Sequence, residues 1–429
     1  MLFAHIGVID GEFELHDDWF VGVEGAFITY VGPTEPEADY GERYDGRGKV
    51  IMPGLVNAHT HVPMTLLRGY AENLPLDRWL QEMIWPFEAL ITEETALPAA
   101  RLAYAEALRF GTVSLTDMYT FSEARIRAIE ESGIKCNMAH GVLAFDPSVP
   151  YDAMPEKAIS DKLVDEFNGV FGGRLKIELA PHAPHTVVEP VLRAMAEHAA
   201  DRGIGVHVHV AETRAEQEQV MEMTGMTPVA YLESLGILDV PVTAAHCVWA
   251  TDDDLAILAA RDATVATCPA SNLKLGSGIP STRRFLASGA NLAIGTDGVS
   301  SNNALNLFRD MYLAAIAHKG AELDPVGVSA TDVLRAATAG GAHAQRRDDC
   351  GVIAEGKRAD LIVLDVDVPW MQPVTSMADN IVYAASGSEV VLTMVDGEVL
   401  YKDGEHLTID VERAMRETQA ARDAIAAQL

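Results

Sequence analysis

Hydrophobic and polar positions follow one pattern at the two ends of this chain of 429 residues and another between them. Short alternating segments separated by turns fill residues 1 to about 50, as in WFVGVEGAFITYVG, and return near the C-terminus in VVLTMVDGEVLYKDG. Alternation with a period of two and Asp-Gly turns are typical of hairpin strands. The ends therefore predict one small composite β-sandwich, built from residues 1–50 and 348–409.

Between these ends, in residues 51–347, short apolar runs alternate with amphipathic helical stretches. This alternation is typical of repeated βα units and predicts the α/β class with a parallel (β/α)8 TIM-like barrel. We expect the eight barrel strands at residues 50–56, 112–117, 136–142, 175–181, 204–210, 242–246, 264–268 and 291–296. A final helix over residues 410–429 closes the chain.

One connection is too long for a simple loop. Residues 62–96 follow the first predicted barrel strand and are rich in large apolar side chains, as in LPLDRWLQEMIWPFEALIT. Long insertions between compact elements usually carry function. We therefore expect this segment to cover the barrel mouth and to build a substrate pocket.

Composition excludes several classes of partner. The formal net charge of −31 opposes binding to nucleic acid or to an anionic membrane, because both depend on basic patches. Scattered cysteines without a CxxC pair predict free thiols (Cys136, Cys247, Cys268 and Cys350). No apolar run reaches the roughly 18 residues of a membrane span, and the N-terminus lacks the features of a signal peptide. We expect a cytoplasmic protein.

Ligand-type side chains gather at the ends of four predicted barrel strands. His59 and His61 follow the first strand, His209 ends the fifth, His246 ends the sixth and Asp297 follows the eighth. Barrel enzymes place their reactive groups at the carboxyl ends of the strands, so these side chains are expected to meet at one mouth. Imidazoles with a carboxylate suit one divalent metal ion, zinc or ferrous iron, with a position left for water.

The fifth strand offers two histidines on one face. His207 and His209 are two residues apart and therefore point to the same side of a strand. His209 is nearer the mouth and stands three residues before Glu212. We favour His209 as the metal ligand over His207.

Several longer stretches carry a family resemblance. They are PGLVNAHTHVPMTLLRGYAENLPLDRWLQEMIWPFEALIT, ELAPHAPHTV, HVHVAETRAE, AHCV, CPASNLKLGSG, GTDGVSSNNALNLFRDM and EGKRADLIVLDV. On these stretches, which span essentially the whole chain, the protein resembles the amidohydrolase superfamily and, within it, the 5-methylthioadenosine/S-adenosylhomocysteine deaminases. The resemblance implies hydrolytic deamination of an adenosine-type nucleoside to the inosine analogue and ammonia. It also suggests a homo-oligomer.

The resemblance implies a site with one metal, usually zinc, held by four residues (His59, His61, His209 and Asp297). Two-metal members of the superfamily carry a carboxylated lysine at the end of the fourth strand, whereas Lys176 lies near the beginning of that strand here. Such a metal makes water nucleophilic at neutral pH. Asp297 is expected to accept the proton of that water and pass it to the leaving amino group.

Off the metal, Glu212 is expected to protonate the ring nitrogen and His246 to hydrogen-bond the tetrahedral intermediate. Glu212 also has a structural interpretation, as a carboxylate favoured at a helix N-terminus. Ser301, Asn302 and Asn303 are expected to order the loop after Asp297.

Substrate recognition by resemblance involves three further residues. Glu88 matches the acid that hydrogen-bonds the ribose hydroxyls and His182 the histidine that reaches the nucleoside, while Trp85 is expected to wall the pocket. Each also has a structural interpretation, as an exposed helix acid, a core histidine and a core aromatic residue.

The chain departs from the family at two places. No arginine occurs between Arg127 and Arg174, where the family commonly carries arginines that meet the carboxylate of S-adenosylhomocysteine, and His185 replaces a frequent tyrosine. The neutral nucleosides 5-methylthioadenosine, 5′-deoxyadenosine and adenosine are therefore favoured over S-adenosylhomocysteine.

Two other functions compete with this prediction. The same site could act on another aminated heterocycle, such as an s-triazine or a guanine-like base, for which a ribose-reading Glu88 has no purpose. The barrel could instead be a noncatalytic metal-binding scaffold, but a scaffold does not require Glu212 and His246 as proton donors.

Overall fold

Two β-sheets organise the computed structural model, which describes residues 1–429 with the exception of the side chain at position 77. The larger unit is a barrel of eight parallel strands that are paired in chain order. Its strands are β6 (Leu55–Thr60), β7 (Thr112–Tyr119), β8 (Lys135–Val142), β9 (Leu175–Pro181), β10 (Val206–Val210), β11 (Val242–His246), β12 (Thr264–Thr267) and β13 (Asn291–Ile294). The predicted α/β fold with a (β/α)8 barrel is confirmed.

The second sheet combines both ends of the chain, as predicted. It runs in the order β17-β16-β15-β14-β5-β1-β2-β3, and β4 pairs with β1. The bounds are β1 (Leu2–Ile9), β2 (Leu15–Glu24), β3 (Phe27–Gly32), β4 (Arg43–Asp45), β5 (Lys49–Pro53), β14 (Leu361–Asp365), β15 (Val390–Val395), β16 (Glu398–Lys402) and β17 (Glu405–His406). The antiparallel pairing of β14 with β5 joins the C-terminal strands to the N-terminal ones.

The prediction of one barrel strand over residues 50–56 was wrong, because this stretch forms two strands. The structure divides it into β5, which belongs to the composite sheet, and β6, which belongs to the barrel. Gly54 stands between them, and a Cβ atom there would lie 2.2 Å from Cγ1 of Val113. The apolar run is continuous because both strands are buried, so hydrophobicity alone did not reveal the change of sheet. The predicted domain boundaries remain a prediction.

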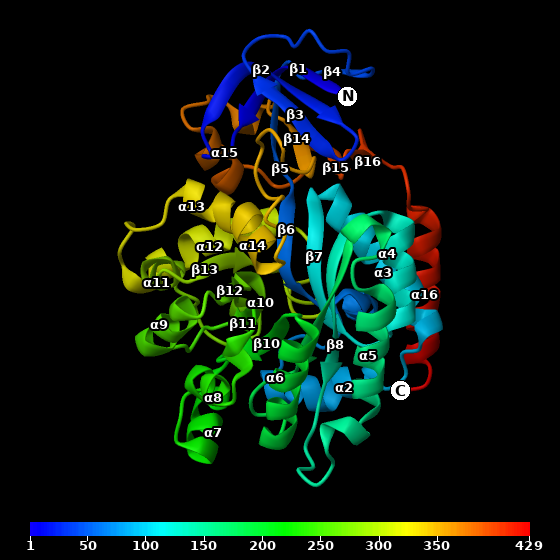
Figure 1. The fold of residues 1–429 in the computed structure, drawn as a ribbon, viewed down its shortest axis with the longest axis vertical. Coiled ribbons are helices and arrows are strands. Elements are labelled where there is room, and N and C mark those ends of the chain that lie inside the picture. The colour runs from blue at the N-terminus through cyan, green and yellow to red at the C-terminus, as the bar shows by residue number, and fades with distance from the viewer.

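Helices surround the barrel, and the composite sheet lies at one end of it (Figure 1). The α-helices are α1 (Leu76–Arg78), α2 (Trp85–Glu88), α3 (Glu93–Arg109), α4 (Ser122–Ser132), α5 (Pro155–Phe167), α6 (Glu189–Arg202), α7 (Arg214–Thr224), α8 (Pro228–Ser234), α9 (Asp252–Ala260), α10 (Pro269–Lys274), α11 (Thr282–Ser288), α12 (Leu307–Glu322), α13 (Ala330–Arg335), α14 (Gly341–Ala344), α15 (Met377–Tyr383) and α16 (Val411–Ala426). The final helix α16 packs against α3. Within the part of the chain that the structure describes, no helix combines the length and apolarity needed to cross a membrane.

Shorter helical turns complete the connections. The 3-10 helices are η1 (Val62–Leu67), η3 (Tyr151–Ala153), η4 (Phe171–Gly173), η5 (Ile237–Asp239) and η7 (Pro369–Met371), and the π-helices are η2 (Trp79–Ile84) and η6 (Ala336–Gly340). The inserted segment after β6 thus contains η1, α1, η2 and α2. Figure 1 shows α2 at the end of the barrel opposite the composite sheet.

Side-chain hydrogen bonds link the first and last barrel strands. The Asn57 amide donates to Oγ1 of Thr296 at 2.8 Å, and the Thr296 backbone N–H donates to Oδ1 of Asn57 at 3.0 Å. The N–H of Asp297 then donates to the carbonyl of His59 at 2.9 Å. These bonds bring the end of β6 and the loop after β13 together, which places His59 and Asp297 side by side.

Candidate metal centre and active site

Four predicted ligands meet at the carboxyl ends of the barrel strands. His59 lies near the end of β6, His61 follows it, His209 lies near the end of β10, and Asp297 lies in the loop after β13. Oδ1 of Asp297 is 3.1 Å from Nε2 of His61 and 3.4 Å from Nε2 of His59. Nε2 of His209 is 3.3 Å from Nε2 of His61. The structure therefore brings these side chains into one cluster.

In His61 and His209, the second ring nitrogen, Nδ1, contacts a backbone carbonyl. Nδ1 of His61 lies 2.5 Å from the Met118 carbonyl oxygen, and Nδ1 of His209 lies 2.8 Å from the His182 carbonyl oxygen. An imidazole that donates from Nδ1 keeps its lone pair on Nε2, which is the usual arrangement of metal-ligating histidines. The backbone thus orients both rings with Nε2 toward the cluster.

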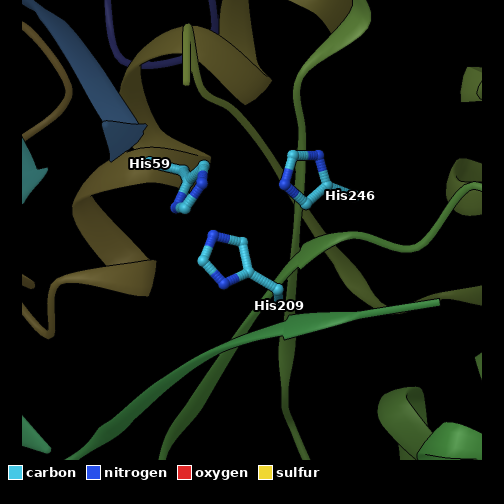
Figure 2. Close-up of side chains that lie close together, drawn as sticks. All are labelled: His59, His209 and His246. Carbon is cyan, nitrogen blue, oxygen red and sulfur yellow. The ribbon is translucent and has the colours of Figure 1, made fainter. Parts of the chain in front are cut away.

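The cluster fits a metal ion. Nε2 of His59 is buried and makes no hydrogen bond within the described structure, although a buried imidazole nitrogen normally has a partner. Ligand atoms of His59, His61 and Asp297 lie within 4.8 Å of one another, and so do those of His59, His209 and His246. Figure 2 shows the rings of His59, His209 and His246 around a common space. Nitrogen donors with a carboxylate are a typical zinc set.

Asp297 is fixed in an unusual backbone conformation. Its φ angle is +61°, and its carboxylate accepts hydrogen bonds at Oδ2 from the hydroxyls of Ser271 at 2.6 Å and Ser301 at 2.8 Å. Burial alone would raise the pKa of Asp297, but the contacts with His59 and His61 hold that pKa well below its usual range. Asp297 is therefore ionised and can serve as a ligand and as a proton acceptor.

The strand-4 lysine lies away from this cluster. Nζ of Lys176, near the beginning of β9, donates to the carbonyl of Arg346 at 2.6 Å, whereas the end of the same strand leads into Pro181 and His182. A bridging lysine is therefore not available at the mouth from β9. This placement favours a centre with one metal.

His246 is oriented as a hydrogen-bond donor. The amide of Asn272 donates to its Nδ1 at 3.0 Å, so the ring of the neutral imidazole carries its proton on Nε2. Nε2 lies 3.8 Å from Oε2 of Glu212. Although the position of His246 would allow metal contact, this tautomer presents an N–H group to the site rather than a lone pair.

Glu212 lies beside the cluster without belonging to it. Its Oε1 accepts a hydrogen bond from the Ser277 hydroxyl at 3.2 Å. Burial is the main influence on the pKa of Glu212 and raises it above its usual value. Its backbone N–H donates to Oε2 of Glu216 at 2.8 Å, and the N–H of Ala211, whose φ is +50°, donates to Oε1 of Glu216. Glu216 thus holds the turn that orients Glu212, a largely buried acid that is well suited to deliver a proton.

A cavity of about 350 Å³ opens next to these groups. Its wall includes the predicted substrate residues Trp85, Glu88 and His182, and apolar side chains from the inserted segment and neighbouring loops (Met64, Leu76, Trp79, Leu80, Leu143 and Leu275). No lysine or arginine contributes to this wall among the residues that the structure describes. The insertion therefore covers the mouth, and the metal-ligand cluster forms one side of the cavity.

His182 presents a lone pair toward the ligand space. The Thr186 hydroxyl donates to the Ala183 carbonyl at 3.2 Å and therefore accepts from Nδ1 of His182, which lies 2.9 Å away. Burial lowers the pKa of His182 to about 3, so the ring is neutral. The remaining nitrogen, Nε2, is free to accept a hydrogen bond from a substrate.

Some residues of the site were not predicted from the sequence. Tyr119, at the end of β7, donates a hydrogen bond to Glu88 inside the cavity. Ser271 and Asn272 follow β12 in the CPASN segment, where the position after a barrel strand could have identified them. Among the residues predicted to order the loop, Ser301 contacts Asp297, whereas Asn302 donates to the Thr296 carbonyl at 2.8 Å.

Known proteins share this sequence and architecture. Residues 50–400 match the model of the amidohydrolase family. The 5-methylthioadenosine/S-adenosylhomocysteine deaminase of Moorella thermoacetica is 43% identical over 86% of this chain and 85% of its own length. The 5′-deoxyadenosine deaminase of Methanothermobacter thermautotrophicus is 39% identical over 93% of both chains. A crystal structure of an adenosine deaminase from Xanthomonas campestris with bound zinc superposes with a TM-score of 0.94, at 32% identity, over 99% of this chain and 98% of that one.

Proposed function

The chain belongs to the amidohydrolase family, and on that premise we propose that it removes the 6-amino group of an adenosine-type nucleoside by hydrolysis. The products are the inosine analogue and ammonia. The observation that carries the proposal is the shared cavity, whose wall includes the metal-ligand cluster, a protonatable acid, Glu212, and a second acid, Glu88. Relatives that carry names of adenosine-type deaminases support it.

The metal would be held by four side chains (His59, His61, His209 and Asp297). When bound, such an ion supplies Lewis acidity that makes water a nucleophile at neutral pH. Zinc is the metal we propose, because this donor set is typical of it and a zinc-containing structure resembles the chain.

The protein side chains then divide the proton transfers. Asp297 accepts a proton from the attacking water as the oxygen adds to C6 of the purine. Glu212 donates its proton to the adjacent ring nitrogen, which takes up the electron pair displaced from the C=N bond. Asp297 passes its proton to the amino group, the C–N bond breaks, and ammonia leaves. The hydroxyl group on C6 gives its remaining proton to the Glu212 carboxylate as the C6 carbonyl forms, while the ring nitrogen keeps the proton that Glu212 donated. Both acids therefore return to their starting protonation states.

His246 stabilises the oxygen that adds to C6. Its Nε2–H group faces the region between Glu212 and His59, so it can donate a hydrogen bond to that oxygen while Asn272 holds the tautomer. Glu88 and His182 bind the sugar and base, and Trp85 walls the cavity.

The wall of the cavity favours an uncharged 5′ substituent. The described wall residues include apolar side chains and carboxylates but no lysine or arginine to pair with the carboxylate of S-adenosylhomocysteine. Burying an unpaired carboxylate beside acids is unfavourable. We propose that 5-methylthioadenosine, 5′-deoxyadenosine and adenosine are better substrates. A higher kcat/KM for S-adenosylhomocysteine than for 5-methylthioadenosine would overturn this preference.

A substrate panel tests the proposed function. Purified zinc-loaded protein is mixed with the adenosine analogues, and turnover is followed by the change of the adenine ultraviolet spectrum to that of hypoxanthine and by ammonia release. An s-triazine and guanine are included to test the alternative heterocycles. Turnover confined to these free rings would contradict the proposal, and ammonia release from no compound would favour the scaffold.

Quaternary structure and compartment remain predictions. The family resemblance favours a homo-oligomer in the cytoplasm with a nucleoside as its small-molecule ligand and without nucleic acid or membrane partners. Light scattering coupled to size-exclusion chromatography measures the mass of the assembly directly.

A further inference from the structure

We propose that Tyr119 and Glu88 form one recognition element for the two vicinal hydroxyls of the ribose, which makes Tyr119 a specificity-determining residue. This inference rests on the proposed function, since it requires a nucleoside in the cavity. Tyr119 ends β7, whereas Glu88 ends α2 in the segment inserted after β6. Two separate parts of the chain therefore meet at this pair.

The contact between the two side chains is direct. The Tyr119 hydroxyl donates a hydrogen bond to Oε1 of Glu88 at a distance of 2.5 Å, and both residues line the cavity beside the metal-ligand cluster. The centre of the Tyr119 ring lies 6.2 Å from that of His61. A ligand that reaches the cluster therefore passes close to the pair.

The remaining hydrogen-bonding capacity of the pair is all of one kind. The O–H group of Tyr119 already donates to Glu88, so the phenol oxygen can only accept further hydrogen bonds through its lone pairs. Oε2 of Glu88 makes no hydrogen bond to any side chain or backbone group that the structure describes. It is not fully buried, so a ligand in the cavity can reach it. The pair therefore offers at least two neighbouring acceptors, which complement the two O–H donors of a cis-diol.

Electrostatics keep this arrangement in one protonation pattern. Burial and the neighbouring charge of Glu88 hold the pKa of Tyr119 well above its usual range, so the phenol remains a donor toward the carboxylate. Burial raises the pKa of Glu88, and the hydrogen bond from Tyr119 opposes that rise. Tyr119 thus helps to keep Glu88 in its ionised, accepting form.

The loss of a ribose hydroxyl from the substrate should strongly reduce kcat/KM at such a site. A pocket built to hydrogen-bond a hydroxyl rejects the analogue that lacks it, because its own buried polar groups are left without partners. Without the phenol, Glu88 loses its fixed orientation and one acceptor disappears. Removal of the Tyr119 hydroxyl should therefore reduce the discrimination between ribose and deoxyribose, beyond a general loss of activity.

The experiment compares adenosine with 2′-deoxyadenosine and 3′-deoxyadenosine in the zinc-loaded wild type, Tyr119→Phe, Glu88→Gln and the double variant. The measured quantity is the ratio of kcat/KM for adenosine to that for each deoxy analogue. Tyr104→Phe is the matched control, because the Tyr104 hydroxyl is buried and makes no hydrogen bond in the described structure. Zinc content and thermal unfolding are recorded for each protein.

We expect the wild type to favour adenosine by roughly 10-fold or more over at least one deoxy analogue, as for a hydrogen bond to a charged group. Tyr119→Phe should lose most of that ratio, mainly through KM, with unchanged zinc content. Its effect should shrink in the Glu88→Gln background, since the two groups act as one unit. Tyr104→Phe should keep the wild-type ratio.

Two outcomes would contradict the inference in different ways. If the wild type deaminates and discriminates, while both Tyr119→Phe and Glu88→Gln keep its ratio, the recognition element is wrong and the proposed function stands. If the wild type deaminates none of the nucleosides, the proposed function fails and the inference falls with it. Should Tyr119→Phe not fold, a crystal structure of the wild type with a bound adenosine analogue decides. The inference requires one ribose hydroxyl within hydrogen-bond distance of the Tyr119 oxygen and the other within that distance of Glu88, and a Tyr119 oxygen that contacts neither hydroxyl would overturn it.

Discussion

Nε2 of His207 lies 2.7 Å from Nδ1 of His59, and the two imidazole rings are stacked with centroids 4.9 Å apart and planes 10° from parallel. Burial holds the pKa of His207 well below its usual range, so its ring is neutral and can accept a hydrogen bond. When His59 donates from Nδ1, its Nε2 keeps the lone pair that a metal requires. His207 therefore orients a ligand from a deeper position on β10.

Replacing His207 should weaken metal binding. His207→Leu removes the acceptor behind His59, and we expect the metal affinity to fall by about 10- to 100-fold, as is typical for groups that orient a metal ligand. His207→Gln, which retains an acceptor, should lose less. Competition with a chelator measures both affinities. His140→Leu is a control, because His140 is buried and contacts Ser122 outside the cluster. Equal affinities for His207→Leu and the control would refute this role.

Metal loading should release a proton from His61. Burial opposes a charge on this ring, but contact with Asp297 prevails and raises the pKa of His61 to about 9 in the metal-free protein. At pH 7.5 the ring is therefore protonated, and it must lose that proton before Nε2 can bind an ion. Calorimetric titration with zinc in buffers of different ionisation enthalpy should show release of about one proton from this site. A heat of binding that is independent of the buffer would contradict the prediction.

Removing the acid of Glu212 should slow the chemical step. Glu212→Gln keeps the shape of the side chain but cannot donate a carboxyl proton to the ring nitrogen, and we expect kcat to fall by about 10²- to 10⁴-fold. Zinc content should stay at the wild-type level, because Glu212 lies outside the proposed ligand set. Steady-state kinetics with metal analysis checks both. Glu218→Gln, on the exposed face of α7, is the matched control. Near-normal turnover of Glu212→Gln would rule out the proton-donor role.

Most of the fold and of the candidate site could be predicted from polar residues at the ends of the predicted strands. The barrel and the clustering of His59 with Asp297 followed from polar residues at the ends of apolar runs, because parallel strands of a barrel end at one mouth. The division at Gly54 was missed because β5 and β6 are both buried and form one apolar run. Tyr119 was missed because its partner, Glu88, comes from a distant insertion, and such a contact has no local periodicity.

Raising the pH should weaken the fold through Asp310. This carboxyl on α12 is fully buried and accepts hydrogen bonds from the Asn302 side chain at 2.9 Å and from the Ala270 N–H at 3.1 Å. Burial outweighs those bonds and raises the pKa of Asp310 from 3.8 to about 7. Between about pH 4 and pH 7, Asp310 is therefore protonated in the folded protein but ionised in the unfolded chain. The free energy of unfolding falls as the pH rises through that range.

Asp310→Asn should remove this pH dependence, because an amide does not titrate. We expect the free energy of unfolding of the wild type to fall relative to that of Asp310→Asn between pH 4.5 and pH 7.5, with a slope of at most about 1.4 kcal/mol per pH unit. Urea unfolding of the metal-free proteins at the two pH values measures the difference, and Asp253→Asn at an exposed position is the control. If the wild type and Asp310→Asn changed in parallel, Asp310 would already be ionised in the folded protein, and its hydrogen bonds to Asn302 and Ala270 would outweigh burial.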